Sequence, residues 1–193
     1  GWRTAFLQFI KGDRGTGEAR FAGGLSGLLD FRTLGRGFVL PGREREKDRD
    51  AALSAWEQAR DAVLSGRFRL VVLDEFTYLL RNEPAIGSLF QRAWDHELSK
   101  LPNLKLLLTG SLLGMMAREI FSYQAPLYGR ATAQIRLRPL PYGAVSELFP
   151  ERRADERVAI FGVTGGVPAY LELFTRTPDY ASALRDHCLV PGS

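Results

Sequence analysis

Short apolar runs alternate along the chain with longer segments whose apolar residues recur every three or four positions. The short runs predict buried strands at residues 5–10, 70–73, 104–108 and 133–137. The longer segments predict helices over residues 48–65, 84–98 and about 112–121. Strands and helices in this order predict an α/β fold, in which helices cover both faces of a parallel sheet.

Two stretches depart from this alternation. Residues from about 12 to 42 are rich in glycine and are expected to be irregular. The chain after Tyr142 has a helical pattern that is interrupted at Gly165–Pro168. We therefore expect an α/β domain over residues 1–141 and a helical domain over residues 142–193.

Composition narrows the class of protein. Hydrophobic residues make up 45% and charged residues 25%, as in ordinary globular proteins.

The net charge of +4 arises entirely within residues 1–70, but the densest charged stretch, residues 43–50, alternates in sign. Such alternation is typical of a solvated surface, so a DNA partner is disfavoured without being excluded. The single cysteine, Cys188, rules out a disulfide framework and favours a cytoplasmic protein. The apolar runs are too short to span a membrane.

Candidate chemistry lies where two of the predicted strands end. Asp74 and Glu75 follow the apolar run 70–73, and ligands of parallel sheets bind at the carboxyl ends of strands. Asp74 could hold Mg²⁺ on the phosphates of a nucleotide, and Glu75 could polarise a water molecule for attack. Thr109 and Ser111 follow the next strand and would lie beside the same site. The alternatives are two solvated acids and a serine that caps a helix.

A phosphate-binding loop is not evident in the sequence. The glycine-rich stretch 12–18 follows a strand, but it lacks the Gly-Lys-[Ser/Thr] sequence that brings an ammonium group to the β- and γ-phosphates. A surface loop is the better interpretation. The two histidines, His96 and His187, lack the spacing of metal ligands or of a catalytic triad.

Residues 1 to about 80 carry a set of motifs that can be compared with known families. These motifs are FLQFIKG (6–12), Thr16-Gly17-Glu18, Gly37-Phe38, AWEQARDAVLSGRFRLVVLDE (55–75) and Thr77-Tyr78. Together they resemble the P-loop corrinoid adenosyltransferases, which transfer adenosyl from ATP to cob(I)alamin or its precursors. The resemblance implies ATP, Mg²⁺ and a corrinoid as ligands, and it implies that Phe38 helps to pack the corrinoid. Other aromatic residues of that corrinoid site are replaced by Val39-Leu40-Pro41-Gly42.

Residues from about 70 to 190 resemble a second family, the prokaryotic and archaeal AAA-like ATPases. The matching segments are VVLDEF, NEPAIGSLFQRAWDHELSK, LKLLLTGSLLGMM, YQAPLYGRATAQIRLRPL and GGVPAYLELF. The resemblance implies a P-loop NTPase-like, Rossmann-type sheet and a partial helical lid after Tyr142. It also implies that Ser111 is the polar residue at a strand end. Arg130 would then touch phosphate, in its own subunit or in a neighbouring one, unless it forms a structural salt bridge.

The chain therefore resembles a hybrid of two families that joins within residues 70–80. In both families the carboxylates that match Asp74 and Glu75, a Walker B pair, serve Mg-ATP. Both families also carry their first strand and phosphate loop upstream of the part matched by residue 1, so we expect weak Mg-ATP binding and little turnover. The leading interpretation is an ATPase that hydrolyses Mg-ATP. The alternatives are a corrinoid adenosyltransferase and a regulatory or DNA-associated module.

Overall fold

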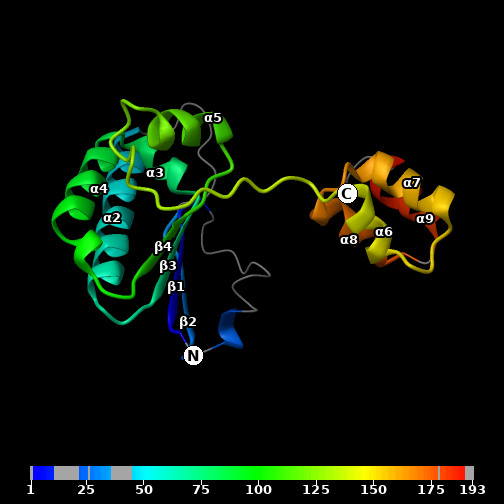
Figure 1. Cartoon of the computed structure of the whole chain (residues 1–193), viewed down its shortest axis with the longest axis horizontal. Coiled ribbons are helices and arrows are strands. Elements are labelled where there is room, and N and C mark those ends of the chain that lie inside the picture. Colours follow the sequence, from blue (N-terminus) through cyan, green and yellow to red (C-terminus); the bar gives the residue numbers. More distant parts are fainter. Residues whose placement is uncertain (1, 11–21, 26, 36–44, 178, 190–193) are drawn as a thin grey trace. The chain divides into compact units, whose positions relative to one another are not determined.

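The computed structural model describes residues 2–10, 22–25, 27–35, 45–177 and 179–189 of the 193-residue chain. The chain divides into two compact units, residues 1–132 and 133–193. The division lies slightly earlier in the chain than the boundary that we expected before Tyr142 (Figure 1).

The first unit is built on a parallel sheet. Its strands are β1 (Thr4–Gln8), β2 (Leu29–Thr33), β3 (Leu70–Asp74) and β4 (Lys105–Leu108), in the spatial order β2-β1-β3-β4. All three pairings are parallel, which confirms the α/β class expected from the sequence.

Strand β2 was not expected, because it lies in the glycine-rich stretch that was predicted to be irregular. Its apolar residues Leu29 and Phe31 alternate with the charged Asp30 and Arg32. This alternation is a strand signal. The ring of Phe31 stacks on Phe6 of β1 with 5.4 Å between the ring centroids, which gives the strand a packing partner.

Helices follow strands β2, β3 and β4. They are α2 (Arg45–Leu64), α3 (Phe76–Asn82), α4 (Ala85–His96) and α5 (Leu113–Met116), with a 3-10 turn at Leu98–Lys100 and a π-helical turn at Ala117–Phe121. Helices α2, α3 and α4 lie along one face of the sheet (Figure 1). The helices expected near 48–65, 84–98 and 112–121 are therefore present, and α3 is an additional one.

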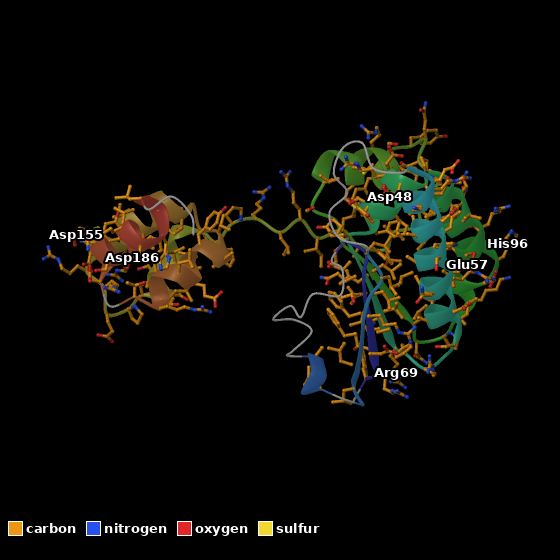
Figure 2. The ribbon with its side chains drawn as sticks, turned by 180° about the vertical axis from the view of Figure 1, so that it is seen from behind. Asp48, Glu57, Arg69, His96, Asp155 and Asp186 are labelled. Carbon is orange, nitrogen blue, oxygen red and sulfur yellow. The ribbon has the colours of Figure 1, made fainter. Side chains whose placement is uncertain are left out.

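The core of this unit lies between the sheet and these helices. Ala5 and Leu7 of β1 are fully buried, and they pack in one cluster with Trp56, Phe76 and Phe90 from the helices. Since side chains alternate along a strand, the residues between them point to the opposite face of the sheet. The exposed polar side chains of Glu57 and His96 lie on the outer side of the helix layer (Figure 2).

Ion pairs between arginine and glutamate side chains connect the helices of this unit. Arg60 of α2 donates to both carboxylate oxygens of Glu97, at 2.8 Å each. Glu83, which is buried between α3 and α4, accepts from the backbone N–H of Ala85 and pairs with Arg49 of α2. These bonds, with the backbone donor contributing most, hold the pKa of Glu83 below its usual value of 4.5.

Glu83→Gln is expected to lower the stability of the first unit at neutral pH and to matter less in acid. A carboxylate whose pKa is lowered on folding stabilises the fold above its unfolded pKa and stops doing so as pH falls through its folded pKa. The difference in melting temperature between wild type and variant should therefore shrink below about pH 4.5. A difference that stayed constant from pH 7 to pH 3 would contradict this role of the charge.

The second unit is a small helical cluster. It contains α6 (Tyr142–Leu148), α7 (Ala154–Thr164), α8 (Pro168–Thr175), α9 (Tyr180–Leu184) and a π-helical turn at Arg185–Leu189. Val145, Ile160, Leu171 and Phe174 form its buried core. The helical pattern expected after Tyr142 is therefore confirmed, and none of the helices in the described ranges is long and apolar enough to cross a membrane.

The strand expected at residues 133–137 is absent, so that prediction was wrong. These residues have no secondary structure, and the side chains of Ile135 and Leu137 are 81% and 89% exposed. The short run of residues that predicted the strand is only a local signal. A strand also needs a neighbouring edge to pair with, and no described residue pairs with this segment.

Candidate functional site

A polar row crosses the carboxyl edge of the sheet. Gln8 ends β1, Asp74 ends β3 and Thr109 follows β4, and the parallel register sets Gln8 beside Asp74. Gln8 Nε2 donates to Asp74 Oδ2 at 3.0 Å, and Thr109 Oγ1 donates to Asp74 Oδ1 at 2.6 Å. Both oxygens of the carboxylate are therefore held by neutral donors from the two adjacent strands.

The bonds continue from Thr109 to Glu75 and Ser111. The backbone N–H of Glu75 donates to Thr109 Oγ1 at 3.2 Å, and the backbone N–H of Ser111 donates to Glu75 Oε2 at 3.2 Å. Glu75 has a left-handed backbone with φ of 57°, which is uncommon for a residue other than glycine and recurs at functional sites as well as in turns. The structure thus brings together four residues predicted from the sequence: Asp74, Glu75, Thr109 and, through its backbone, Ser111.

The two carboxylates at this edge have no cationic partner in the described part of the chain. None of the described lysines, arginines or histidines forms an ion pair with Asp74 or Glu75. The described residues also contain no cluster of three metal-ligating side chains. Mg²⁺ that arrives with a nucleotide needs only one or two protein carboxylates, because phosphates and water supply its other ligands. The donor set therefore fits a nucleotide-borne Mg²⁺ better than a metal held by the protein alone.

Arg130 lies elsewhere in the first unit. Its Nε and Nη2 atoms donate to Asp95 of α4 at 2.9 and 2.7 Å, and Nη1 donates to the carbonyl of Pro126 at 2.9 Å. The bond from Arg130 is the main cause that lowers the pKa of Asp95. This geometry favours the structural salt bridge over contact with phosphate.

Two predicted features lie outside the described residues. They are Phe38, assigned to the corrinoid by resemblance, and the glycine-rich stretch 12–18.

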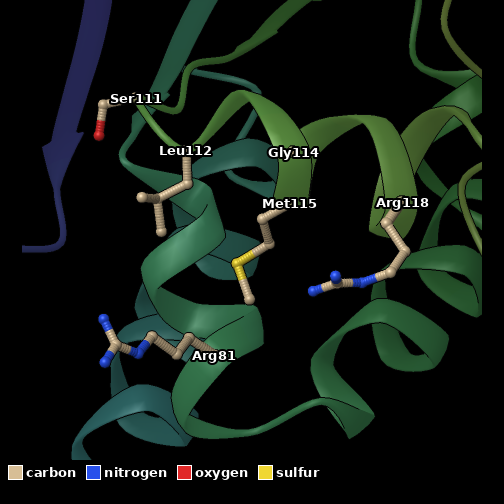
Figure 3. Close-up of a pocket in the computed structure, with 6 residues that line it drawn as sticks. All are labelled: Arg81, Ser111, Leu112, Gly114, Met115 and Arg118. Atoms are coloured by element: carbon tan, nitrogen blue, oxygen red, sulfur yellow. The ribbon is translucent and has the colours of Figure 1, made fainter.

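A hollow of about 550 Å³ opens beside Ser111 (Figure 3). It is lined by Arg81 of α3 and by Ser111, Leu112, Gly114, Met115 and Arg118. The thioether of Met115 lies between the guanidinium groups of Arg81 and Arg118 in this view. Arg118 also pairs with the neighbouring Glu119.

Gly110 leaves room for two neighbouring side chains. A Cβ at this position would lie 2.9 Å from Cγ2 of Thr77 and 3.0 Å from Sδ of Met116. Thr77 is fully buried, and among the described residues its hydroxyl has no hydrogen-bond partner. The turn between Thr109 and Ser111 is therefore packed closely against α3 and α5.

Gly110→Ala is expected to lower the free energy of unfolding by about 1–3 kcal/mol, the usual effect of overpacking. Gly114→Ala is the matched control, because a Cβ there meets no atom within 4 Å. In helix α5 that change should be neutral or stabilise by up to about 1 kcal/mol. Urea unfolding of both variants tests this expectation. Equal midpoints of unfolding for the two variants would show that the turn can accommodate a methyl group at Gly110.

Sequence analysis did not identify Gln8 as a site residue. The signal was a polar residue that interrupts the apolar run 5–10 near its end. Its importance depends on β1 lying next to β3, and the order of strands in a sheet cannot be inferred from a polar residue within one strand.

Comparison with known proteins gives a family match for more than half of the chain. The sequence model of the ATP:corrinoid adenosyltransferase BtuR/CobO/CobP family matches residues 1–113. The match extends past residue 80, where that resemblance was expected to end. The predicted resemblance to corrinoid adenosyltransferases is thus confirmed.

Individual relatives are similar over shorter stretches. The uncharacterized protein MJECL04 of Methanocaldococcus jannaschii is 39% identical over 104 residues, which are 54% of this chain and 24% of that protein. Corrinoid adenosyltransferases of a Sinorhizobium species and of Pseudomonas aeruginosa are 38% and 32% identical over 82 residues, 42% of this chain. The chain spans 38% and 40% of those two enzymes, so it is similar to well under half of each.

A solved structure is also similar to the chain. It is the Walker-type ATPase PABY2304 of Pyrococcus abyssi, at 18% identity and a TM-score of 0.47. The similarity covers 96% of this chain and 66% of that one.

Proposed function

The chain belongs to the ATP:corrinoid adenosyltransferase BtuR/CobO/CobP family, and from this premise we propose that its acidic strand end serves adenosyl transfer from ATP to a corrinoid. The observation that carries the proposal is the row Gln8–Asp74–Thr109, which holds a carboxylate at the ligand-binding edge of a parallel sheet. Family membership supports adenosyl transfer more than hydrolysis, which is the reverse of the order expected from the sequence.

Asp74 and Glu75 would hold Mg²⁺ on the triphosphate of ATP. The metal would offset the negative charge of the phosphates. The hydroxyl of Thr109 donates to the Asp74 carboxylate, and the backbone N–H of Ser111 donates to the Glu75 carboxylate. Both carboxylates are therefore already held in place before a nucleotide binds, which lowers the free-energy cost of organising the site.

Transfer and hydrolysis make different demands on Glu75. Adenosyl transfer breaks the bond between the 5′-carbon and its oxygen, and the triphosphate leaves intact. Hydrolysis breaks the terminal phosphoanhydride bond and needs a group that activates water. In adenosyl transfer Glu75 has only to hold the cation, a task that is compatible with its bond to the N–H of Ser111. Packing of the corrinoid by Phe38 is a further part of the proposal.

Nuclear magnetic resonance of the labelled 193-residue chain tests nucleotide binding, since it detects even millimolar affinity. Mg-ATP should shift the backbone amides of Glu75, Thr109 and Ser111 and the side-chain amide of Gln8. The Asp74→Asn variant is the control and should show little change. The absence of shifts at this edge in the wild-type chain would overturn the proposed site.

The identity of the phosphate product tests the reaction itself. With a reduced corrinoid and Mg-ATP, the proposal predicts an adenosylated corrinoid and inorganic triphosphate in equal amounts. Release of ADP without dependence on the corrinoid would favour the ATPase interpretation instead.

A further inference from the structure

Gln8 is a buried polar residue at the end of strand β1. Gln8 is 4% exposed, and it is one of four buried polar or charged residues in the described part of the chain. Its Nε2 donates to Asp74, but its Oε1 is buried and has no hydrogen-bond partner among the described residues. A buried acceptor without a partner costs about 1–3 kcal/mol. An apolar side chain of the same size would avoid that cost, so the glutamine needs another explanation.

The backbone on both sides fixes the position of this amide. The N–H of Leu34, just after β2, donates to the carbonyl of Gln8 at 2.8 Å. On the other side, the N–H of Phe9 donates to the carbonyl of Asp74 at 3.2 Å. The side chains of Gln8 and Asp74 therefore start from adjacent, bonded positions on neighbouring strands.

The orientation of the amide follows from its neighbour. If the amide turned over, Oε1 would face Oδ2 of Asp74 at about the distance at which Nε2 now lies, and two acceptors would repel each other. The unpaired Oε1 is thus the consequence of directing a donor at the carboxylate. With Thr109 on the other oxygen, the plane of the Asp74 carboxylate is fixed from both sides.

We infer that Gln8 is a positioning residue, which orients the Asp74 carboxylate toward the divalent cation of a bound nucleoside triphosphate. The inference rests on the proposed function and extends it to a residue that would touch neither the nucleotide nor the cation. Groups that hydrogen-bond to a metal-binding side chain typically change metal affinity by about 10–100-fold when they are removed.

Gln8→Met separates positioning from simple packing. Methionine has nearly the same size and shape but no donor, so the affinity for Mg-ATP should fall by about tenfold or more. The weak affinity for ATP without Mg²⁺ should stay unchanged. The melting temperature should stay equal or rise, because the buried acceptor has been removed. A packing role predicts a lower melting temperature and an equal loss for ATP with and without the metal.

The outcomes distinguish the inference from the proposed function. If Gln8→Met binds Mg-ATP like wild type while Asp74→Asn does not, the inference is wrong and the site stands. If Asp74→Asn also binds like wild type, or if the wild-type chain does not respond to Mg-ATP, both are wrong. A loss of affinity in Gln8→Met that appears only with Mg²⁺, together with a melting temperature that is equal or higher, would establish the positioning role.

Discussion

Asp74→Asn is expected to weaken the binding of Mg-ATP by about a hundredfold or more while the chain stays folded. The change removes one negative charge at the carboxyl edge and leaves the shape of the side chain. A unit charge about 4 Å from a cation is worth about 4 kcal/mol at an effective dielectric constant of 20, which exceeds the energy of a hundredfold change. Titration by nuclear magnetic resonance, with the shifts of Thr109 and Ser111 as the readout, gives the ratio of affinities.

The fold should tolerate this variant because its neighbours can adapt. The new side-chain amide can donate to Oε1 of Gln8 once the Gln8 amide turns over, and Thr109 can keep donating to the remaining oxygen. We therefore expect a small change in melting temperature, within about 1 kcal/mol in stability. Circular dichroism of both proteins measures it.

Asp30→Asn is the matched control on a different strand. Asp30 lies on β2 and accepts from Nε and Nη2 of Arg32 at 2.9 and 2.6 Å, so this variant also loses a bonded carboxylate. It should bind Mg-ATP like wild type, because Asp30 is not part of the polar row. Equal losses of affinity in Asp30→Asn and Asp74→Asn would show that net charge, not the polar row, determines binding. No loss of affinity in Asp74→Asn would show that the cation does not bind at this edge.

Much of the α/β unit could be predicted because its signals are local. The apolar runs that became β1, β3 and β4 are short, and their ends are marked by polar residues or glycine. Strand β2 carries a weaker signal, since only Leu29 and Phe31 are apolar and the strand depends on stacking against Phe6. Helix α3 was missed because it starts within two residues of the β3 terminus, where Asp74 and Glu75 suggested a site and not a helix start.

In the candidate site, too, the residues with a local signal could be predicted and those that depend on distant contacts could not. Asp74, Glu75, Thr109 and Ser111 were predicted because the ends of consecutive strands meet at one edge of a parallel sheet. Gln8 and the separate position of Arg130 depend on strand order and on a contact with Asp95, which is 35 residues away in the sequence. Residue types and spacing alone do not contain that information.

Gly166→Ala is expected to unfold the second unit or to destabilise it by about 3 kcal/mol or more. Gly166 has a φ of 75°, and a Cβ there would lie 2.1 Å from the carbonyl oxygen of Leu140. The atom in the way belongs to the backbone, and Leu140 is itself held by a 2.8 Å bond from its N–H to the carbonyl of Gly166. The contact therefore cannot be relieved without breaking the bond that connects Leu140 to the start of helix α8.

Gly165→Ala is the control, because it shares the unusual backbone but not the crowding. Gly165 ends α7 with a φ of 59°, and a Cβ there meets no atom within 4 Å. Only the left-handed backbone penalty of about 1–2 kcal/mol should apply. Amide resonances of α6 to α9 report on this unit apart from the sheet, whose resonances should stay unchanged in both variants. If Gly166→Ala melts no earlier than Gly165→Ala, the close approach of Leu140 does not determine the stability of this unit.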